Sequence, residues 1–489
     1  MDSKPHPLHI FFFPKLAHGE LIPIIDMARL FARQAGVKAT IVTTQLNASF
    51  FSQTIESERK LGVDIDIHMI KFPFMEAGLP EGCENFSSTT SQEMGLKFIK
   101  AVVSLLQQPL EQILEDCRPN CLVADAVFPW ATEVARKLGI PRLVFHGTSY
   151  FTLSVFDSLL RYEPQKNVTS DYEPFEVPGI PDKIEMTRLQ QPDELRERVD
   201  DEIKKLMYQA LESEITSYGV IMNSFQELEP AYVEHYRKVM GRKTWCIGPL
   251  SLCNRNTEDK SQRGNTASID PVECFSWLDS KKHNSVLYIC FGSLSCFSAA
   301  QLYEIAKGLE ASGQDFIWVV EKKMNKEDKE KWLPEGFEER MEGKGLIIRG
   351  WAPQVLILDH EAVGGFMTHC GWNSTMESIT AGVPMVTWPL SNEQFYNEKL
   401  VTLILKVGIG VGAQEWSDWM VEKKLLVTKE NIAKAVTQLM VGEEANDIRN
   451  RASALKEMAK RAVEEAGSSH SDLKDLLDGL RLNSSPREL

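Results

Sequence analysis

Short apolar runs alternate along the chain with stretches in which apolar residues recur at helical spacing. Residues 8–13 (LHIFFF) are almost continuously apolar, as expected for a parallel strand buried on both faces. Apolar positions at helical spacing follow at Leu21, Ile24, Ile25, Ala28 and Phe31. Residues 38–43 supply a second strand, and the same βαβ pattern recurs downstream at residues 122–124, 130–138 and 142–145. The pattern predicts a doubly wound α/β fold.

The alternation stops once, near the middle of the chain. Residues 254–268 (NRNTEDKSQRGNTAS) are polar and almost free of apolar residues, which is typical of an interdomain linker. Residues 219–223 are expected to be the last strand before it, and strands resume at residues 285–291, 316–321, 345–349, 364–368 and 384–387. We expect one domain at residues 1–250, a linker at 251–270, a second domain at 271–465 and a terminal helical segment at 466–489.

Charge and cysteine usage exclude several classes of protein. The 489 residues include 54 Lys and Arg against 69 Asp and Glu, a net charge of −15 that would repel nucleic acid and anionic lipid. No window approaches the ~20 apolar residues of a membrane span, and the N-terminus lacks the layout of a signal peptide. Nine scattered cysteines without a CxxC pair indicate reduced thiols. These features predict a cytoplasmic protein.

Two short motifs resemble binding sites but fit parts of β-strands better. Asp64 and Asp66 form a DxD pattern, yet they alternate with apolar residues, as in a strand with one solvated face. Residues 408–412 (GIGVG) follow a predicted helix instead of a strand, so they fit the start of a strand better than a nucleotide loop.

Residues 369–375 (HCGWNST) are the most informative local stretch. They lie between a predicted strand and a predicted helix, where exposed backbone N–H groups and the helix dipole favour a phosphate. His369 is placed to add a further donor. Ser374 and Glu377 also match a capping box, which needs no ligand. The local sequence leaves both interpretations open.

The wider context of this stretch carries a family resemblance. Residues 351–394, from WAPQ to NEQ, closely resemble the signature box of the plant secondary-metabolite UDP-glycosyltransferases. Further matches are the FFFP…HGxxIP start and the segments CLVADAVFPWA, FHGTS, MNSFQELEP, WCIGPL, YICFGSLS and FYNEKL. The resemblance therefore covers most of the chain. It is strongest to the branch whose acceptors are flavonoids, other phenolics and triterpenoids.

The resemblance implies a GT-B fold, in which two Rossmann-like domains face each other across a cleft. The first domain would bind a hydrophobic hydroxylated acceptor, and the second a UDP-sugar, without a metal or other cofactor and as a monomer. The terminal helix would return to the first domain. The implied acceptor pocket comprises the first loop, residues 74–91, Phe128, residues 145–151 and residues 189–206.

The resemblance also assigns donor-binding residues position by position. Trp351 would stack on uracil, Gln354 would hold the nucleoside, and Glu377 would accept hydrogen bonds from the ribose hydroxyls. Other donor contacts are implied for Ala352, His369, Gly371, Trp372, Asn373, Ser374, Ser293, Trp388, Glu393, Gln394 and Thr148. A terminal Gln is associated with glucose in this family, so Gln394 favours UDP-glucose. Neutral donors and a helix N-terminus would stabilise the departing UDP.

The chain departs from the family at the catalytic position. The family places a His three residues before the Pro of the first loop, where it takes a proton from the acceptor and is oriented by an Asp. That Asp corresponds to Asp125, but Glu20 stands at the His position, with His18 two residues before it. His18 is a weaker candidate for the base. Lys15 stands where the family usually has an apolar residue, and it could pair with Glu20.

Three explanations of Glu20 remain open on the sequence. Glu20 could serve as the base of an active inverting transferase. It could instead be a replacement that reduces transfer or redirects it towards sugar removal or exchange. The protein could also bind UDP-sugar without efficient transfer.

Overall fold

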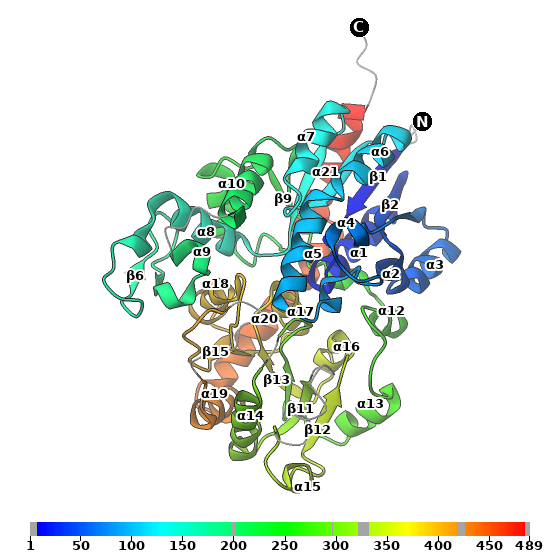
Figure 1. Ribbon diagram of the computed structural model, residues 1–489. Coiled ribbons are helices and arrows are strands. Elements are labelled where there is room, and N and C mark those ends of the chain that lie inside the picture. The colour runs from blue at the N-terminus through cyan, green and yellow to red at the C-terminus, as the bar shows by residue number, and fades with distance from the viewer. Residues whose placement is uncertain (1–6, 197–201, 296, 321–331, 418–425, 485–489) are drawn as a thin grey trace.

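Two parallel β-sheets organise the chain, one in each half, with helices packed around them (Figure 1). The computed structural model describes residues 7–196, 202–295, 297–320, 332–417 and 426–484. The charged stretch at 322–331 and part of the predicted acceptor segment at 189–206 lie outside the described residues.

The first sheet has seven strands in the order β3-β2-β1-β4-β5-β8-β9, and every neighbouring pair is parallel. Its strands are β1 (Leu8–Phe13), β2 (Val37–Thr44), β3 (Ile65–Ile70), β4 (Cys121–Asp125), β5 (Arg142–His146), β8 (Gly219–Met222) and β9 (Thr244–Cys246). The prediction that residues 219–223 form the last strand is wrong, because the three-residue β9 extends the edge of the sheet. So short a strand gives little periodic signal.

The apolar run of β1 is explained by packing on both faces of the sheet. Phe12 contacts Phe31 of α1 (His18–Ala32), with ring centroids 5.5 Å apart. Phe13, on the opposite face, contacts Phe128 at 4.6 Å. In β3, by contrast, Asp66 forms ion pairs with Lys38, at 2.9 Å, and Arg59. The half-solvated strand predicted for the DxD pattern is confirmed.

The second sheet has six parallel strands in the order β12-β11-β10-β13-β14-β15. These strands are β10 (Val286–Cys290), β11 (Asp315–Val320), β12 (Gly345–Arg349), β13 (Val363–Thr368), β14 (Met385–Thr387) and β15 (Gly408–Gly410). β15 begins in the GIGVG stretch, as the strand interpretation predicts.

Long helices connect these strands. Besides α1, those of eight or more residues are α3 (Ser52–Lys60), α5 (Gln92–Ser104), α6 (Gln107–Cys117), α7 (Trp130–Lys137), α8 (Tyr150–Tyr162), α10 (Glu202–Ile215), α11 (Pro230–Lys238), α13 (Pro271–Asp279), α14 (Ala299–Ser312), α17 (Trp372–Ala381), α19 (Lys429–Val441), α20 (Ala445–Val463) and α21 (Ser468–Ser484).

Two connections join the halves. The polar stretch at 254–268 leads from the first sheet to the second and contains the short helix α12 (Thr257–Ser261). At the end of the chain, α21 lies beside the first sheet (red in Figure 1). There Asp472 accepts hydrogen bonds from the Cys246 N–H, at 2.7 Å, and from Arg237, at 3.2 Å. The leucines of α21 join the core of the first half, which fixes this crossover.

Candidate active site

Each sheet has a point at which the order of its strands reverses, and both points open onto one cleft of about 1210 Å³. In the first sheet the reversal lies between β1 and β4, so the first turn of α1, which carries Glu20, and the end of β4 at Asp125 meet there. In the second it lies between β10 and β13, which bring together Ser293 and His369. Open parallel sheets bind ligands at such points.

The end of the cleft that is expected to be catalytic contains an ion pair. Glu20, in the first turn of α1, receives a hydrogen bond from Lys15 Nζ at 2.8 Å, and its side chain is 26% exposed. Asp125 lies nearby and accepts a hydrogen bond from the Val127 N–H at 3.0 Å. Burial, and then the negative charge of Glu20, raise the pKa of Asp125 to about 6, although Lys15 opposes this shift. The two carboxylates therefore repel each other.

Glu393 adds a third carboxylate to this region. Its removal from bulk water and the charge of Glu20 raise its pKa to about 7, while Lys15 acts in the opposite direction. Lys15 is therefore the cation that three carboxylates share. The positive charge of Lys15 therefore limits how far the pKa values of Asp125 and Glu393 rise.

His18 points away from the catalytic end. Its Nε2 lies 3.2 Å from Asn265 Oδ1 of the linker, and its ring lies 4.8 Å from Phe50 and 5.8 Å from Trp351. These contacts place His18 on the same side of the cleft as Trp351. The structure therefore gives Glu20, rather than His18, the position beside Asp125.

At the opposite wall, His369 is enclosed by two glycines. A side chain on Gly292 or Gly371 would approach its ring to 2.7 or 2.4 Å, so both positions require the absence of a Cβ. Burial lowers the pKa of His369 to about 4, and the imidazole is neutral at pH 7. Within the described residues, its Nδ1 has no hydrogen-bond partner. A neutral N–H donor at this place suits an anionic group.

The helix that follows does not begin with a capping box. α17 starts at Trp372, with Gly371 as its N-cap, three residues earlier than a cap at Ser374 would require. Ser374 instead accepts a hydrogen bond from Gln354 Nε2 at 3.1 Å. Asn373, in the first turn, donates to the Gly19 carbonyl across the cleft. The capping interpretation is wrong, and the N-terminus of α17 opens onto the cleft.

The expected nucleoside residues lie together beyond this turn. Gln354 Nε2 donates to Glu377 Oε2 at 2.7 Å, and Glu377 also forms an ion pair with Arg263 of the linker. The Trp351 N–H donates to Ser268 Oγ at 2.9 Å. Glu377 is only 5% exposed, so its carboxylate is held by partners rather than by bulk water.

Two of the residues predicted to contact the donor, Gln394 and Trp388, are placed differently. Gln394 lines the cleft, and its Oε1 accepts from the N–H groups of Leu390, at 2.8 Å, and Ser391, at 2.9 Å. Its amide NH₂ is therefore the end available to a ligand. Trp388 is 1% exposed and packs on Phe291 and Phe297, so its side chain does not line the cleft.

Most of the predicted donor and catalytic residues do line this cleft. They are His18, Glu20, Asp125, Thr148, Ser293, Trp351, Ala352, Gln354, His369, Gly371, Trp372, Asn373, Ser374, Glu377, Glu393 and Gln394. Phe128, predicted for the acceptor pocket, is fully buried under Phe13 instead.

The linker contributes residues to the cleft that the sequence does not indicate. Lys260, Arg263, Asn265, Thr266 and Ser268 also line the cleft. Their polar composition correctly indicates a connection between domains, but composition carries no sign that such a connection folds back onto a site.

The described residues show neither a metal-binding cluster nor a membrane-spanning helix. They contain no group of three His, Cys, Asp or Glu side chains that could hold a metal ion. No helix among them has the length and apolar character needed to cross a membrane.

Comparison with known proteins agrees with this geometry. The family model for UDP-glucuronosyl and UDP-glucosyl transferases matches residues 45–445. Scopoletin glucosyltransferase of Nicotiana tabacum is 55% identical, with 98% of this chain and 99% of the relative covered. The UDP-glucose flavonoid 3-O-glucosyltransferase 7 of Fragaria ananassa is 53% identical, with 98% of both chains covered.

A solved structure matches over nearly the whole length. It is a Glycyrrhiza uralensis glycosyltransferase in complex with glycyrrhetinic acid 3-O-monoglucuronide, with a TM-score of 0.91 and 42% identity over 98% of this chain and 96% of that chain. The two facing sheets are thus a GT-B fold. On its sequence, its fold and the cleft between its domains, the chain belongs to the UDP-glucuronosyl and UDP-glucosyl transferase family and is a plant UDP-glycosyltransferase.

Proposed function

We propose that this enzyme transfers glucose from UDP-glucose, with inversion at the anomeric carbon, to a hydroxyl of a hydrophobic phenolic, flavonoid or triterpenoid in the cytoplasm. The observation that carries the proposal is the single cleft in which Glu20 and Asp125 face the expected donor residues. Relatives named for scopoletin and a flavonoid, and a structure holding a triterpenoid glucuronide, support the acceptor class. Gln394 supports glucose as the sugar.

The proposed step uses Glu20 as the base. Its carboxylate takes the acceptor's hydroxyl proton as that oxygen forms a bond to the anomeric carbon. The bond from this carbon to the UDP oxygen breaks on the opposite face, and UDP leaves with the electron pair. His369, Asn373, Ser374 and Ser293 would donate to the diphosphate beside the N-terminus of α17.

Glu20 makes this step slower than it would be with histidine. A carboxylate is an intrinsically weaker base than imidazole by about two pKa units. Lys15 also donates a hydrogen bond to Glu20 Oε1 at 2.8 Å, so one oxygen of the proposed base is already engaged. The same ion pair favours a second candidate function, a protein that binds UDP-sugar with little transfer.

The proposal is tested by incubating the protein with UDP-glucose and a pool of flavonoids and triterpenoids. We expect an acceptor-dependent product that is heavier by one hexose, with one UDP released per product, detected by liquid chromatography and mass spectrometry. Tight UDP binding without product would favour the binding protein. Release of free glucose without a glycoside would favour sugar removal.

A further inference from the structure

One linker side chain connects the expected ribose site to the helix that carries Glu20. Arg263 donates from Nε to Asp26 Oδ2 of α1 at 2.8 Å, and its Nη1 pairs with Glu377 of α17. The side chain of Arg263 is only 11% exposed. It therefore bridges two buried carboxylates that belong to different domains.

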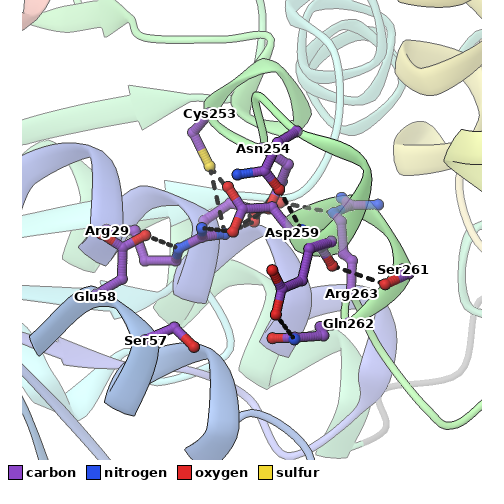
Figure 2. Close-up of polar contacts among 12 residues, drawn as sticks. Arg29, Ser57, Glu58, Cys253, Asn254, Asp259, Ser261, Gln262 and Arg263 are labelled. Carbon is purple, nitrogen blue, oxygen red and sulfur yellow. Dashed lines mark hydrogen bonds and ion pairs between the residues drawn. The ribbon is translucent and has the colours of Figure 1, made fainter. Parts of the chain in front are cut away.

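The end of this bridge at α1 is held firmly. Asp26 is 2% exposed, and its Oδ1 accepts from Asn254 Nδ2 at 3.0 Å. Arg29 lies 3.7 Å from the same oxygen and pairs with Glu58 at 2.7 Å. Figure 2 shows Arg29, Glu58 and Asn254 gathered beside the linker residues. A buried network of hydrogen bonds and ion pairs holds its members in one arrangement.

The other end of the bridge leaves Glu377 suited to a diol. A carboxylate offers about four acceptor positions, two on each oxygen. Arg263 takes one position on Oε1, and Gln354 takes one on Oε2 at 2.7 Å. One position therefore remains on each oxygen, which matches the two neighbouring hydroxyls of a ribose.

The residues next to Arg263 approach the base-binding side of the same site. Gly264 has a φ of +93°, and a Cβ there would lie 2.3 Å from the Trp351 ring, so the linker backbone packs directly on the indole. Asn265 contacts His18 at 3.2 Å. The linker thus forms part of the wall of the site.

We propose that Arg263 is a positioning residue for the donor: it orients Glu377 towards the ribose hydroxyls and fixes that carboxylate to α1. The proposal rests on the proposed function, because it takes Glu377 as the ribose contact. Donor recognition would then depend on a residue outside the second domain's signature box.

The test compares binding of UDP and 2′-deoxy-UDP by calorimetry, which needs no turnover. We expect the unaltered protein to prefer UDP by about tenfold, as for one hydrogen bond to a charged group. Arg263→Met should reduce this preference to less than about threefold. A general loss of positive charge or of structure weakens both ligands together, so the ratio isolates the positioning role.

Two further variants keep the test decisive. Arg263→Lys retains the charge but cannot bridge both carboxylates, so its ratio should fall between those of the unaltered protein and Arg263→Met. Arg33 provides the control, because it also contacts the linker but does not line the cleft. It donates a hydrogen bond of 2.8 Å to the Cys253 carbonyl. Arg33→Gln should leave the ratio unchanged.

An unchanged ratio in Arg263→Met or Arg263→Lys would overturn the proposal. Glu377→Gln separates this failure from that of the donor assignment. If Glu377→Gln loses the preference while both Arg263 variants keep it, Glu377 binds the ribose without help from Arg263. If Glu377→Gln keeps the preference, Glu377 is not the ribose contact, and both the assignment and the inference fail.

Discussion

Two glutamates in the same cleft are held in very different ways. Glu377, in the donor half, is 5% exposed and is bound by Arg263 and Gln354, one partner on each oxygen. Glu20, in the acceptor half, has a side chain that is 26% exposed and paired with Lys15 at 2.8 Å. Its neighbours Asp125 and Glu393 repel it.

The difference shows which part of the reaction the fold prepares in advance. The proposed donor site is built from buried groups whose partners already orient them, so donor binding there would require little rearrangement. At the proposed catalytic end, one ammonium group compensates several carboxylates, so proton transfer there would depend on a local charge balance. Substitutions at the two ends of the cleft should therefore have different kinds of effect.

The largest expected difference concerns stability. Glu377→Ala should lower the free energy of unfolding by about 3 kcal/mol or more, because it leaves the buried Arg263 with one carboxylate fewer. Glu20→Ala should change it by less than about 1 kcal/mol. Urea unfolding of both variants measures the two values. Equal losses would remove the distinction between the two carboxylates.

Trp351→Ala tests the donor half directly. Loss of stacking should weaken UDP binding by roughly 1–3 kcal/mol. Calorimetry provides the measurement, with Trp277→Ala as a control, since Trp277 contacts Lys281 outside the cleft. Unchanged UDP affinity in Trp351→Ala would remove this residue from the uracil site.

A smaller effect is expected on the choice of donor sugar. Gln394→His replaces an amide whose Oε1 is held by the Leu390 and Ser391 N–H groups. The preference for UDP-glucose over UDP-galactose should fall several-fold, about 1 kcal/mol, as one hydrogen bond is exchanged. Competition between the two donors in one reaction gives the ratio, and an unaltered ratio would contradict the role of Gln394.

The smallest effect concerns pH. Lys15 opposes the raised pKa values of Asp125 and Glu393, so Lys15→Met should raise both further above about 6 and about 7. Because these groups then protonate at higher pH, the acidic limb of the pH profile of kcat/KM should shift to higher pH by roughly half a pH unit or more. A limb that stays in place, or moves to lower pH, would show that Lys15 does not govern this charge balance.

The fold was accessible from the sequence because its signals are local, while the residues expected to bind the donor were named by the family resemblance, and most of them line one cleft. A continuous apolar run identifies β1, and a strand followed by HCGWNST predicts the turn that positions His369. The start of α17 was not accessible, since Gly371 and Ser374 both suit a cap and only the surrounding packing decides between them. Nor was the burial of Trp388, which depends on Phe291 and Phe297 from distant segments.

The role of the linker was hidden for the same reason. Arg263 gains its partners Asp26 and Glu377 only when residues 237 and 114 positions away in sequence meet in the fold. A polar stretch between domains gives no pattern for such contacts.

The most direct measurement compares glucosyl transfer by the unaltered protein and by Glu20→His under saturating UDP-glucose. The account predicts slow but measurable transfer with Glu20 and turnover at least about tenfold higher with histidine, because imidazole is the stronger base and Asp125 can orient it. UDP affinity should be equal in both proteins. Equal or higher turnover with Glu20 would contradict the account and make this carboxylate a fully competent base.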